Sequence, residues 1–274
     1  MSTAVLTPTA PARPPSGVRL AVVDAVTMTW RNLRAMTRVP EVIVFSTIQP
    51  IIFVLTFRYV FGGAVGASYT GPGDYTDFLM PGIFVQTVTF GAIQTGIGLA
   101  EDLNKGLIER FRSLPMTRSA VLAGRTLADL MRNVFVVALM VFVGYLVGFR
   151  VQTGVLGFLA GFAVILLFGF SLTWIFAIVG LSAPNAETAQ AMSFPILAPL
   201  VFASSAFVSI ETMPGWLQPF AKYQPVSVAV DAVRSLMLGG QFHNTARVVG
   251  SLAWSIGIVA VFAPLAVRVY RRTA

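Results

Sequence analysis

The 274-residue chain contains no cysteine, a single histidine, two lysines and only 11% charged residues. The lack of cysteine excludes disulfide bonds, thiolate nucleophiles and cysteine-ligated metal sites. The single histidine, His243, excludes zinc motifs that need two histidines. Neither Lys105 nor Lys222 follows a glycine, so the Gly-Lys-Ser/Thr end of a phosphate-binding loop is missing. We therefore expect no catalytic site, metal site or cofactor in this chain.

Charge is scarce because apolar residues dominate. Hydrophobic residues make up 56% of the chain, above the roughly 45–50% of soluble domains, which also carry roughly 25% charged residues. This composition excludes a soluble globular enzyme and a disordered chain, and it predicts an all-α integral membrane protein. The net charge of +8 would suggest a nucleic-acid partner in a soluble protein. Here the basic residues are explained by the cytoplasmic ends of membrane helices, so no nucleic-acid partner is expected.

The amino-terminal region divides into two parts. Residues 1–17 are rich in Pro, Ala, Ser and Thr, which predicts a disordered cytoplasmic tail. Residues 18–41 follow a helical pattern, and a helical wheel groups these apolar side chains: Val22, Val23, Val26, Trp30 and Leu33. The pattern predicts an amphipathic helix in the cytoplasmic membrane interface, with Trp30 at headgroup depth. A helix packed only on protein is the alternative.

Six apolar segments reach the roughly 20 residues needed to cross a bilayer. We expect spans at residues 42–61, 78–99, 127–148, 155–181, 188–209 and 248–267, which together form a transmembrane domain over residues 42–274. Most Lys and Arg residues lie before the first span, between the second and third, and after the sixth. The positive-inside rule then places both termini in the cytoplasm, in a multi-pass protein of the cell membrane.

Polar side chains inside the spans are uncharged in the middle of the membrane, which argues against a proton-driven transporter. Asp129 precedes Arg132 by three residues near a span end, which predicts a structural ion pair on one helix face. Gln86, Phe90 and Gln94 recur every four residues and share a face of the second span. Such residues either form interhelical hydrogen bonds or line a substrate path, and both interpretations stay open. The candidate path residues are Gln49, Phe53, Gln86, Phe90, Gln94, Phe194 and Phe202.

The loop at residues 100–125 carries a dense charged stretch with apolar residues three to four apart. It predicts a short amphipathic helix from Glu101 to Leu114, stopped by Pro115. Its apolar ridge fits a groove in a cytoplasmic partner, whereas a solvated connector is the alternative. The candidate partner-binding residues are Glu101, Asp102, Lys105, Gly106, Leu107, Glu109, Arg110, Phe111, Leu114 and Pro115.

The region at residues 211–240 is semi-apolar but interrupted by prolines. Its segments are too short to span, so we expect an outer re-entrant hairpin of two short helices that pack on other spans. Pro225 can open the second helix, which would run from Val226 to Leu238 and end at Gly239 and Gly240. The candidate hairpin residues are Pro214, Trp216, Pro225, Asp231 and Arg234.

Three stretches resemble the type-2 ABC transporter permeases, and most closely the daunorubicin-resistance-type subfamily of drug and lipid exporters. They are DFLMPGI at residues 77–83, EDLNKGLIERFRSLPMTRSAVLAGR at 101–125, and SSAFVSIETMPGWLQPFAKYQPVSVAVDAVRSLMLGG at 204–240. Together with the six spans, the resemblance covers nearly all of the chain after the tail. One departure is Gln224, because the family more often has asparagine before this proline.

The resemblance implies an exporter permease that moves a hydrophobic or amphipathic compound, such as a drug, antibiotic or lipid, out of the cytoplasm or inner leaflet. It implies two copies of a separate ABC ATP-binding subunit, which hold ATP and Mg and dock on the loop helix as on a coupling helix. It also implies a second permease, either an identical copy in a homodimer or a homologue. Spans one, two and five would form the path. The alternatives are a secondary transporter driven by an ion gradient and a non-transporting membrane scaffold.

Overall fold

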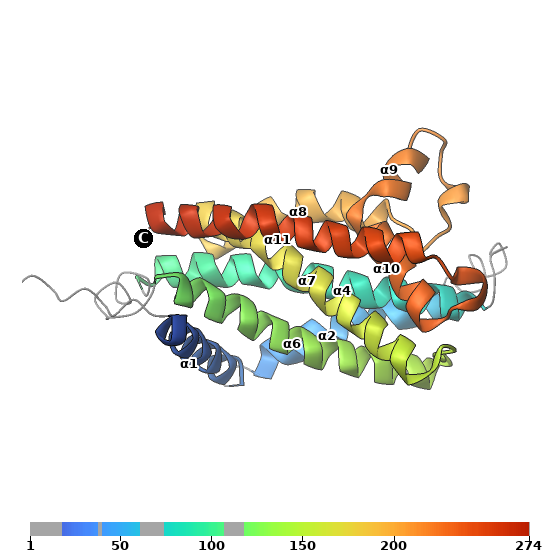
Figure 1. Ribbon diagram of the computed structural model, residues 1–274, viewed down its shortest axis with the longest axis horizontal. Coiled ribbons are helices and arrows are strands. Elements are labelled where there is room, and N and C mark those ends of the chain that lie inside the picture. Colours follow the sequence, from blue (N-terminus) through green and yellow to red (C-terminus); the bar gives the residue numbers. More distant parts are fainter. Residues whose placement is uncertain (1–17, 38–39, 61–73, 107–117, 274) are drawn as a thin grey trace, which may run out of the picture.

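The computed structural model describes residues 18–37, 40–60, 74–106 and 118–273 (Figure 1), and every regular element in these ranges is a helix. The long helices are α1 (Val18–Thr37), α2 (Pro40–Leu55), α4 (Tyr75–Asn104), α6 (Arg118–Val147), α7 (Gly154–Ser182), α8 (Ala186–Phe202) and α11 (Thr245–Thr273). The shorter ones are the π-helix η1 (Thr56–Val60), η2 (Ile210–Thr212), α9 (Gln218–Tyr223), α10 (Pro225–Met237) and η3 (Gly240–Phe242). The all-α class is therefore confirmed for the described residues.

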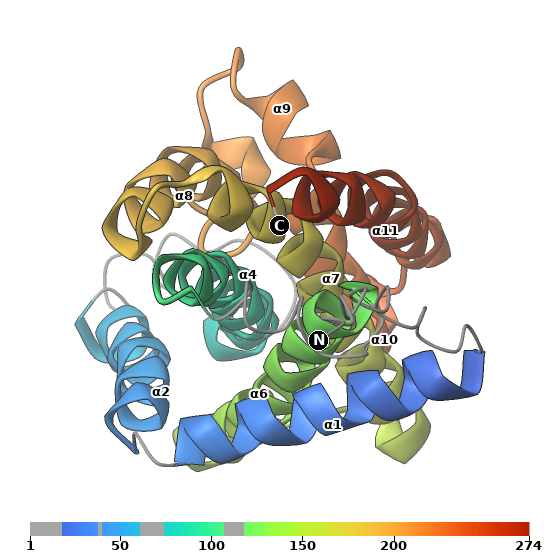
Figure 2. The ribbon, with the colours of Figure 1, turned by 90° about the vertical axis from the view of Figure 1, so that its left-hand side faces the viewer.

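The long helices form a bundle in which α4, α6, α7, α8 and α11 alternate in direction (Figure 1). The carboxyl end of α4, the α7–α8 junction and the carboxyl terminus consequently lie at the same end as α1, which we call the α1 end. The opposite end carries α9 and α10, and we call it the α9 end. Viewed along the bundle, α4 lies among the other helices, whereas α1 crosses the end of the bundle (Figure 2).

Four helices of the described ranges are long and apolar enough to cross a membrane, namely α4, the Val121–Val147 part of α6, α7 and the Thr245–Arg272 part of α11. They match the expected second, third, fourth and sixth spans. The expected first span corresponds to α2 followed by η1, of which Thr47–Val60 forms a shorter apolar helix. The number of six spans stays a prediction.

The expected fifth span is shorter as a helix than the apolar run that predicted it. Helix α8 ends at Phe202, whereas the prediction continued to Ser209. Beyond the helix, the amide of Ser205 donates to Ser227 Oγ of α10 at 3.0 Å, and Ser204 Oγ donates to the carbonyl of Val201. These bonds satisfy the backbone and hydroxyl groups without a continuing helix. An apolar run therefore does not by itself show that a segment is helical along its whole length.

Helix α4 is the most buried of the four and also the least hydrophobic. Its buried threonines return their hydroxyls to their own helix, as Thr87 does to Ile83 and Thr89 to Val85, each at 2.7 Å. Its glycines permit close approach, because a Cβ on Gly96 would lie 2.5 Å from the Phe176 carbonyl oxygen of α7. In a membrane protein, apolar side chains are favoured on the surface that contacts lipid, whereas small and polar residues are favoured where helices pack together. This explains why the most buried helix is the least hydrophobic.

The predicted amphipathic helix is present as α1, which packs on α6. Met28 interrupted the apolar pattern, yet it is buried against Gly124 of α6, and Asn32, one turn further along α1, is buried as well. The apolar face faces away from the described protein, with Val22 and Val26 exposed and Trp30 67% exposed. The orientation of α1 is thus set by Met28, and its apolar stripe is left uncovered.

Candidate functional site

A small cavity of about 60 Å³ lies between α2, α4 and α6. Most of the candidate path residues line it, namely Gln49, Phe53, Gln86, Phe90 and Gln94. The four-residue spacing on α4 therefore does direct three side chains to one place, and α2 supplies the other two. Phe194 and Phe202 are not brought to the cavity, because they lie on α8 with 54% and 52% of their surface exposed.

Two amides in the cavity wall have polar atoms without a partner. Gln86 is 4% exposed and Asn133 is 3% exposed, yet Gln86 Oε1 and Asn133 Nδ2 form no hydrogen bond within the described residues. A buried polar group left unpaired costs about 1–3 kcal/mol. The wall therefore offers one acceptor and one donor to a molecule that enters the cavity.

Several lining residues were not predicted, namely Pro50, Thr87, Gly91, Arg132, Asn133 and Val136. Arg132 was expected only as an ion-pair partner. A usable signal did exist, because Arg132 and Asn133 are adjacent polar residues at the start of the long apolar stretch of the expected third span. That signal does not say which neighbouring helix the two side chains meet.

A buried ion-pair network ties α6 to α4 beside this cavity. Asp129 is fully buried, and its Oδ2 accepts a hydrogen bond of 2.6 Å from Thr95 Oγ1. The guanidiniums of Arg132 and Arg125 each approach the Asp129 carboxylate to 3.5 Å. The predicted Asp129–Arg132 pair is thus confirmed. Arg132 Nη2 also donates to the Gly91 carbonyl at 2.7 Å, which holds this side chain in the cavity wall.

The expected coupling segment begins as part of α4. Glu101 and Asp102 lie in the last turn of α4, so the prediction of a separate helix starting at Glu101 was wrong. The charged residues contain no helix breaker before Gly106, whose φ of +63° turns the chain. Lys105 pairs with Glu101 at 3.2 Å on the surface. The remaining coupling residues lie outside the described residues: Leu107, Glu109, Arg110, Phe111, Leu114 and Pro115.

Asp102, unlike the adjacent Glu101, forms its ion pair away from solvent. Its Oδ2 lies 4.0 Å from Arg125 Nη1, and both side chains are largely buried. Arg125 also donates to the Gln94 carbonyl at 3.3 Å. The loop end of α4 is thereby connected, through Arg125, to the Asp129 network and the cavity wall.

The predicted hairpin consists of α9 and α10 at the α9 end. Helix α10 starts at Pro225, and Gly239 and Gly240 follow it with φ of +62° and +53°, as the sequence indicated. The unusual Gln224 accepts a hydrogen bond from the Val226 amide and donates to the Leu200 carbonyl of α8 at 2.8 Å. Pro214 and Trp216 precede α9 and are exposed.

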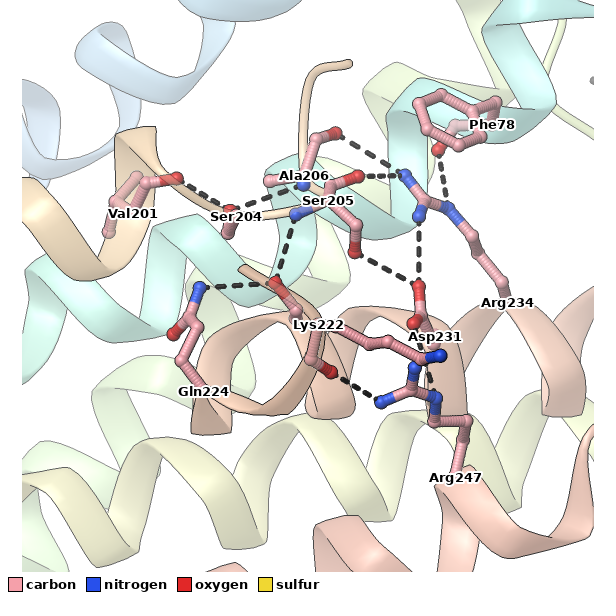
Figure 3. A network of polar contacts seen from close by, with 11 residues as sticks. Phe78, Val201, Ser204, Ser205, Ala206, Lys222, Gln224, Asp231, Arg234 and Arg247 are labelled. Carbon is pink, nitrogen blue, oxygen red and sulfur yellow. Dashed lines mark hydrogen bonds and ion pairs between the residues drawn. The ribbon is translucent and has the colours of Figure 1, made fainter. Parts of the chain in front are cut away.

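Asp231 and Arg234 form a second ion pair, at 3.2 Å, on α10 (Figure 3). Arg234 is 3% exposed and also donates to the carbonyl oxygens of Phe78 at 2.9 Å and Ser205 at 2.7 Å. Arg247 of α11 approaches the other oxygen of Asp231 to 3.6 Å. This network joins α4, the segment after α8, α10 and α11. Sequence reasoning identified Asp231 and Arg234 but none of these partners, which come from distant parts of the chain.

Known proteins are similar to this chain over most of its length. The sequence matches the ABC-2 type transporter family over residues 24–238, from α1 to the end of α10. It is 42% identical over 252 residues to the daunorubicin resistance ABC transporter permease protein DrrB1 of Streptomyces coeruleorubidus, covering 92% of this chain and 87% of that protein. It is 28% identical over 239 residues to the doxorubicin resistance ABC transporter permease protein DrrB of Mycobacterium tuberculosis strain H37Rv, covering 85% and 81%.

Proposed function

The chain belongs to the ABC-2 type transporter family, and from this premise we propose that it is the permease subunit of an exporter driven by ATP hydrolysis on a separate subunit. The compound moved would be hydrophobic or amphipathic, as the names of the drug-resistance relatives suggest. The missing phosphate-binding loop supports a separate motor, with two copies of the ATP-binding subunit holding ATP and Mg.

We propose a six-span topology in a cell membrane, with the α1 end on the cytoplasmic side. The basic residues gathered toward that end support this orientation. The two shorter spans would be α2 with η1, and α8. The exposed Val22, Val26 and Trp30 support placing α1 in the membrane interface, because an uncovered apolar stripe is otherwise unfavourable in water.

We propose a second permease, a copy or a homologue, beside α2 and α8. These two helices flank α4 (Figure 2), and both carry exposed large apolar side chains, including Ile48 and Ile52 of α2 and Phe194 and Ile196 of α8. Such a dimer would enclose a path along α2, α4 and α8, where Phe194 and Phe202 would contact the substrate from α8.

The polar cavity is the observation that carries the proposal for substrate contact. Its unpaired amide oxygen on Gln86 and amide nitrogen on Asn133 can bind a hydroxyl, carbonyl or amide of an otherwise apolar compound. The aromatic rings of Phe53 and Phe90 supply the apolar part of the wall. No acidic residue lies among the cavity residues, which favours ATP-driven export over an ion-coupled mechanism.

The test uses the permease reconstituted in vesicles with its ATPase and with daunorubicin as the first probe. Gln86→Leu and Asn133→Leu should each lower ATP-dependent transport about fivefold, because one hydrogen bond is worth about 1 kcal/mol and a factor of ten about 1.4 kcal/mol. Gln241→Leu, an exposed glutamine at the α9 end, is the matched control. Unchanged transport in both cavity variants would remove the cavity from the path.

Two further measurements separate the proposal from its rivals. Transport that continues without ATP while an ion gradient is kept would favour a secondary transporter. For coupling, we expect the double variant Glu109→Arg with Arg110→Glu to abolish transport and ATPase stimulation while membrane insertion is kept. Full activity of this variant would contradict the proposed docking of the ATPase on the segment after α4.

A further inference from the structure

A hollow with a volume of about 530 Å³ lies at the α9 end. Its walls come from the segment after α8, from α9, α10 and α11. Its charged residues are Glu211, Lys222, Asp231, Arg234 and Arg247. This hollow is separate from the cavity between α2, α4 and α6, since the two have no lining residue in common.

The charges of the hollow do not cancel within it. The carboxylate of Asp231 is shared by Arg234 at 3.2 Å and Arg247 at 3.6 Å, and it also accepts a hydrogen bond from Ser205 Oγ at 2.9 Å. The exposed ammonium of Lys222 has no carboxylate within 4 Å among the described residues. Three cations therefore face two carboxylates, and the surplus positive charge lies with Lys222 and Arg247.

The main chain holds these two cations together. Arg247 Nη1 donates to the carbonyl oxygen of Lys222 at 2.6 Å, and its Nε faces Asp231 (Figure 3). The guanidinium is thus fixed from two sides and cannot swing away from Lys222. An anionic group that meets both residues would pair with a preorganised guanidinium and with the exposed Lys222 ammonium, which lies over the Tyr223 ring at 5.7 Å from its centroid.

Exposed aromatic residues near the hollow indicate where it lies relative to a membrane. Trp216 is 80% exposed, Tyr223 65% and Phe220 45%, and α9 stands out from the bundle at this end (Figure 1). Exposed tryptophan and tyrosine at the end of a membrane bundle are typical of the headgroup region. Tyr223 itself lines the hollow. In the proposed topology the hollow therefore opens at the depth of the lipid headgroups.

We propose that this hollow binds a phospholipid headgroup, with the phosphate between Lys222 and Arg247. Glu211, on the same wall, accepts a hydrogen bond from a donor further along the headgroup. An ethanolamine ammonium or a glycerol hydroxyl supplies such a donor, whereas choline does not. The site thus distinguishes phosphatidylethanolamine and phosphatidylglycerol from phosphatidylcholine, and a bound lipid would bridge α9, α10 and α11.

The experiment is lipid titration of the purified full-length permease in detergent, followed by native mass spectrometry. We expect phosphatidylethanolamine and phosphatidylglycerol to bind at least fivefold more tightly than phosphatidylcholine. Lys222→Gln should lower this binding about fivefold, and Lys222→Arg should keep it. Arg271→Gln, an exposed basic residue at the α1 end, is the matched control and should bind as the unmodified chain does.

Further arms identify the source of the phosphate and the role of Glu211. Glu211→Gln should reduce the preference over phosphatidylcholine while phosphate binding is kept. Equal binding of all three lipids, or unchanged binding in Lys222→Gln, would overturn the proposal. Inorganic phosphate that displaces lipid at equal concentration would show a site for the free anion instead. The assay needs neither ATPase nor transport, so its failure would leave the proposed export function standing.

Discussion

The guanidinium of Arg234 lies over the ring of Phe78, 3.6 Å from the ring centroid, while its Nε donates to the Phe78 carbonyl oxygen at 2.9 Å. One residue of α10 thus holds both the side chain and the backbone of the first turn of α4. The cation–π contact and the charge-assisted hydrogen bond are both strengthened by burial. This relationship fixes α10 on the helix at the centre of the bundle.

Replacing Arg234 should therefore loosen the α9 end. Arg234→Gln leaves the Phe78 and Ser205 carbonyls and one side of Asp231 without their donor, and we expect a loss of stability of about 3–5 kcal/mol. Thermal unfolding in detergent measures it, with Arg271→Gln as the control. In the Arg234→Gln variant, the additional change Asp231→Asn should lower the stability by less than it does in the unmodified chain, because the two residues belong to one network. Strict additivity would contradict a shared network.

Close contact between α4 and α7 should make two glycines irreplaceable. A Cβ on Gly96 would meet the Phe176 carbonyl oxygen, and a Cβ on Gly180 would meet the backbone of Gly96. We expect Gly96→Ala and Gly180→Ala each to destabilise the protein by about 1–3 kcal/mol through overpacking. Gly257→Ala on α11 is the matched control, since nothing lies within 4 Å of its Cβ. Equal unfolding temperatures for all three would show that the helices can separate freely.

Removal of the Asp129 charge should destabilise α6 against α4. Asp129→Asn keeps the volume and a hydrogen-bond acceptor for Thr95, but it leaves Arg125 and Arg132 without their shared carboxylate. We expect a loss of about 3–5 kcal/mol, measured by denaturation in detergent. Glu187→Gln, an exposed acid at the start of α8, should have no measurable effect. Recovery of stability in Asp129→Asn with Arg132→Gln would confirm that the unpaired charge is the cause.

The absence of cysteine makes the proposed topology directly testable. Single cysteines introduced at Gly215 and His243 should react with a membrane-impermeant thiol reagent added outside intact cells. Cysteines at Glu187 and Arg271 should react only after the membrane is opened, because both lie at the α1 end. All four positions are exposed, so protection reports the membrane and not burial in protein. Outside labelling of Arg271→Cys would contradict cytoplasmic termini.

Local features of the chain were predictable because they depend on short-range spacing. The start of α10 at Pro225 and its end just before Gly239 follow from the fixed φ of proline and the positive φ of glycine. The Asp129–Arg132 pair follows from neighbouring positions on one helix face. Gln86, Phe90 and Gln94 share a cavity for the same reason. The start of the predicted loop helix at Glu101 was wrong because a high density of charged residues does not mark where one helix ends and another begins.

The sequence by itself determined an all-helical membrane protein, since composition and periodicity are properties of the chain alone, whereas the permease assignment rested on the three stretches that resemble a known family. Only the tertiary structure decided that Asn133 of α6 faces the same cavity as Gln86 of α4. It also decided that Arg234 finds the Phe78 carbonyl, 156 residues away. Every residue carries the same backbone carbonyl, so the sequence does not indicate which carbonyl accepts a given hydrogen bond. The packing of the helices decides it. The end of α8 at Phe202, earlier than predicted, also depends on tertiary packing. After the helix ends, Ser227 of α10 accepts a hydrogen bond from the backbone amide of Ser205.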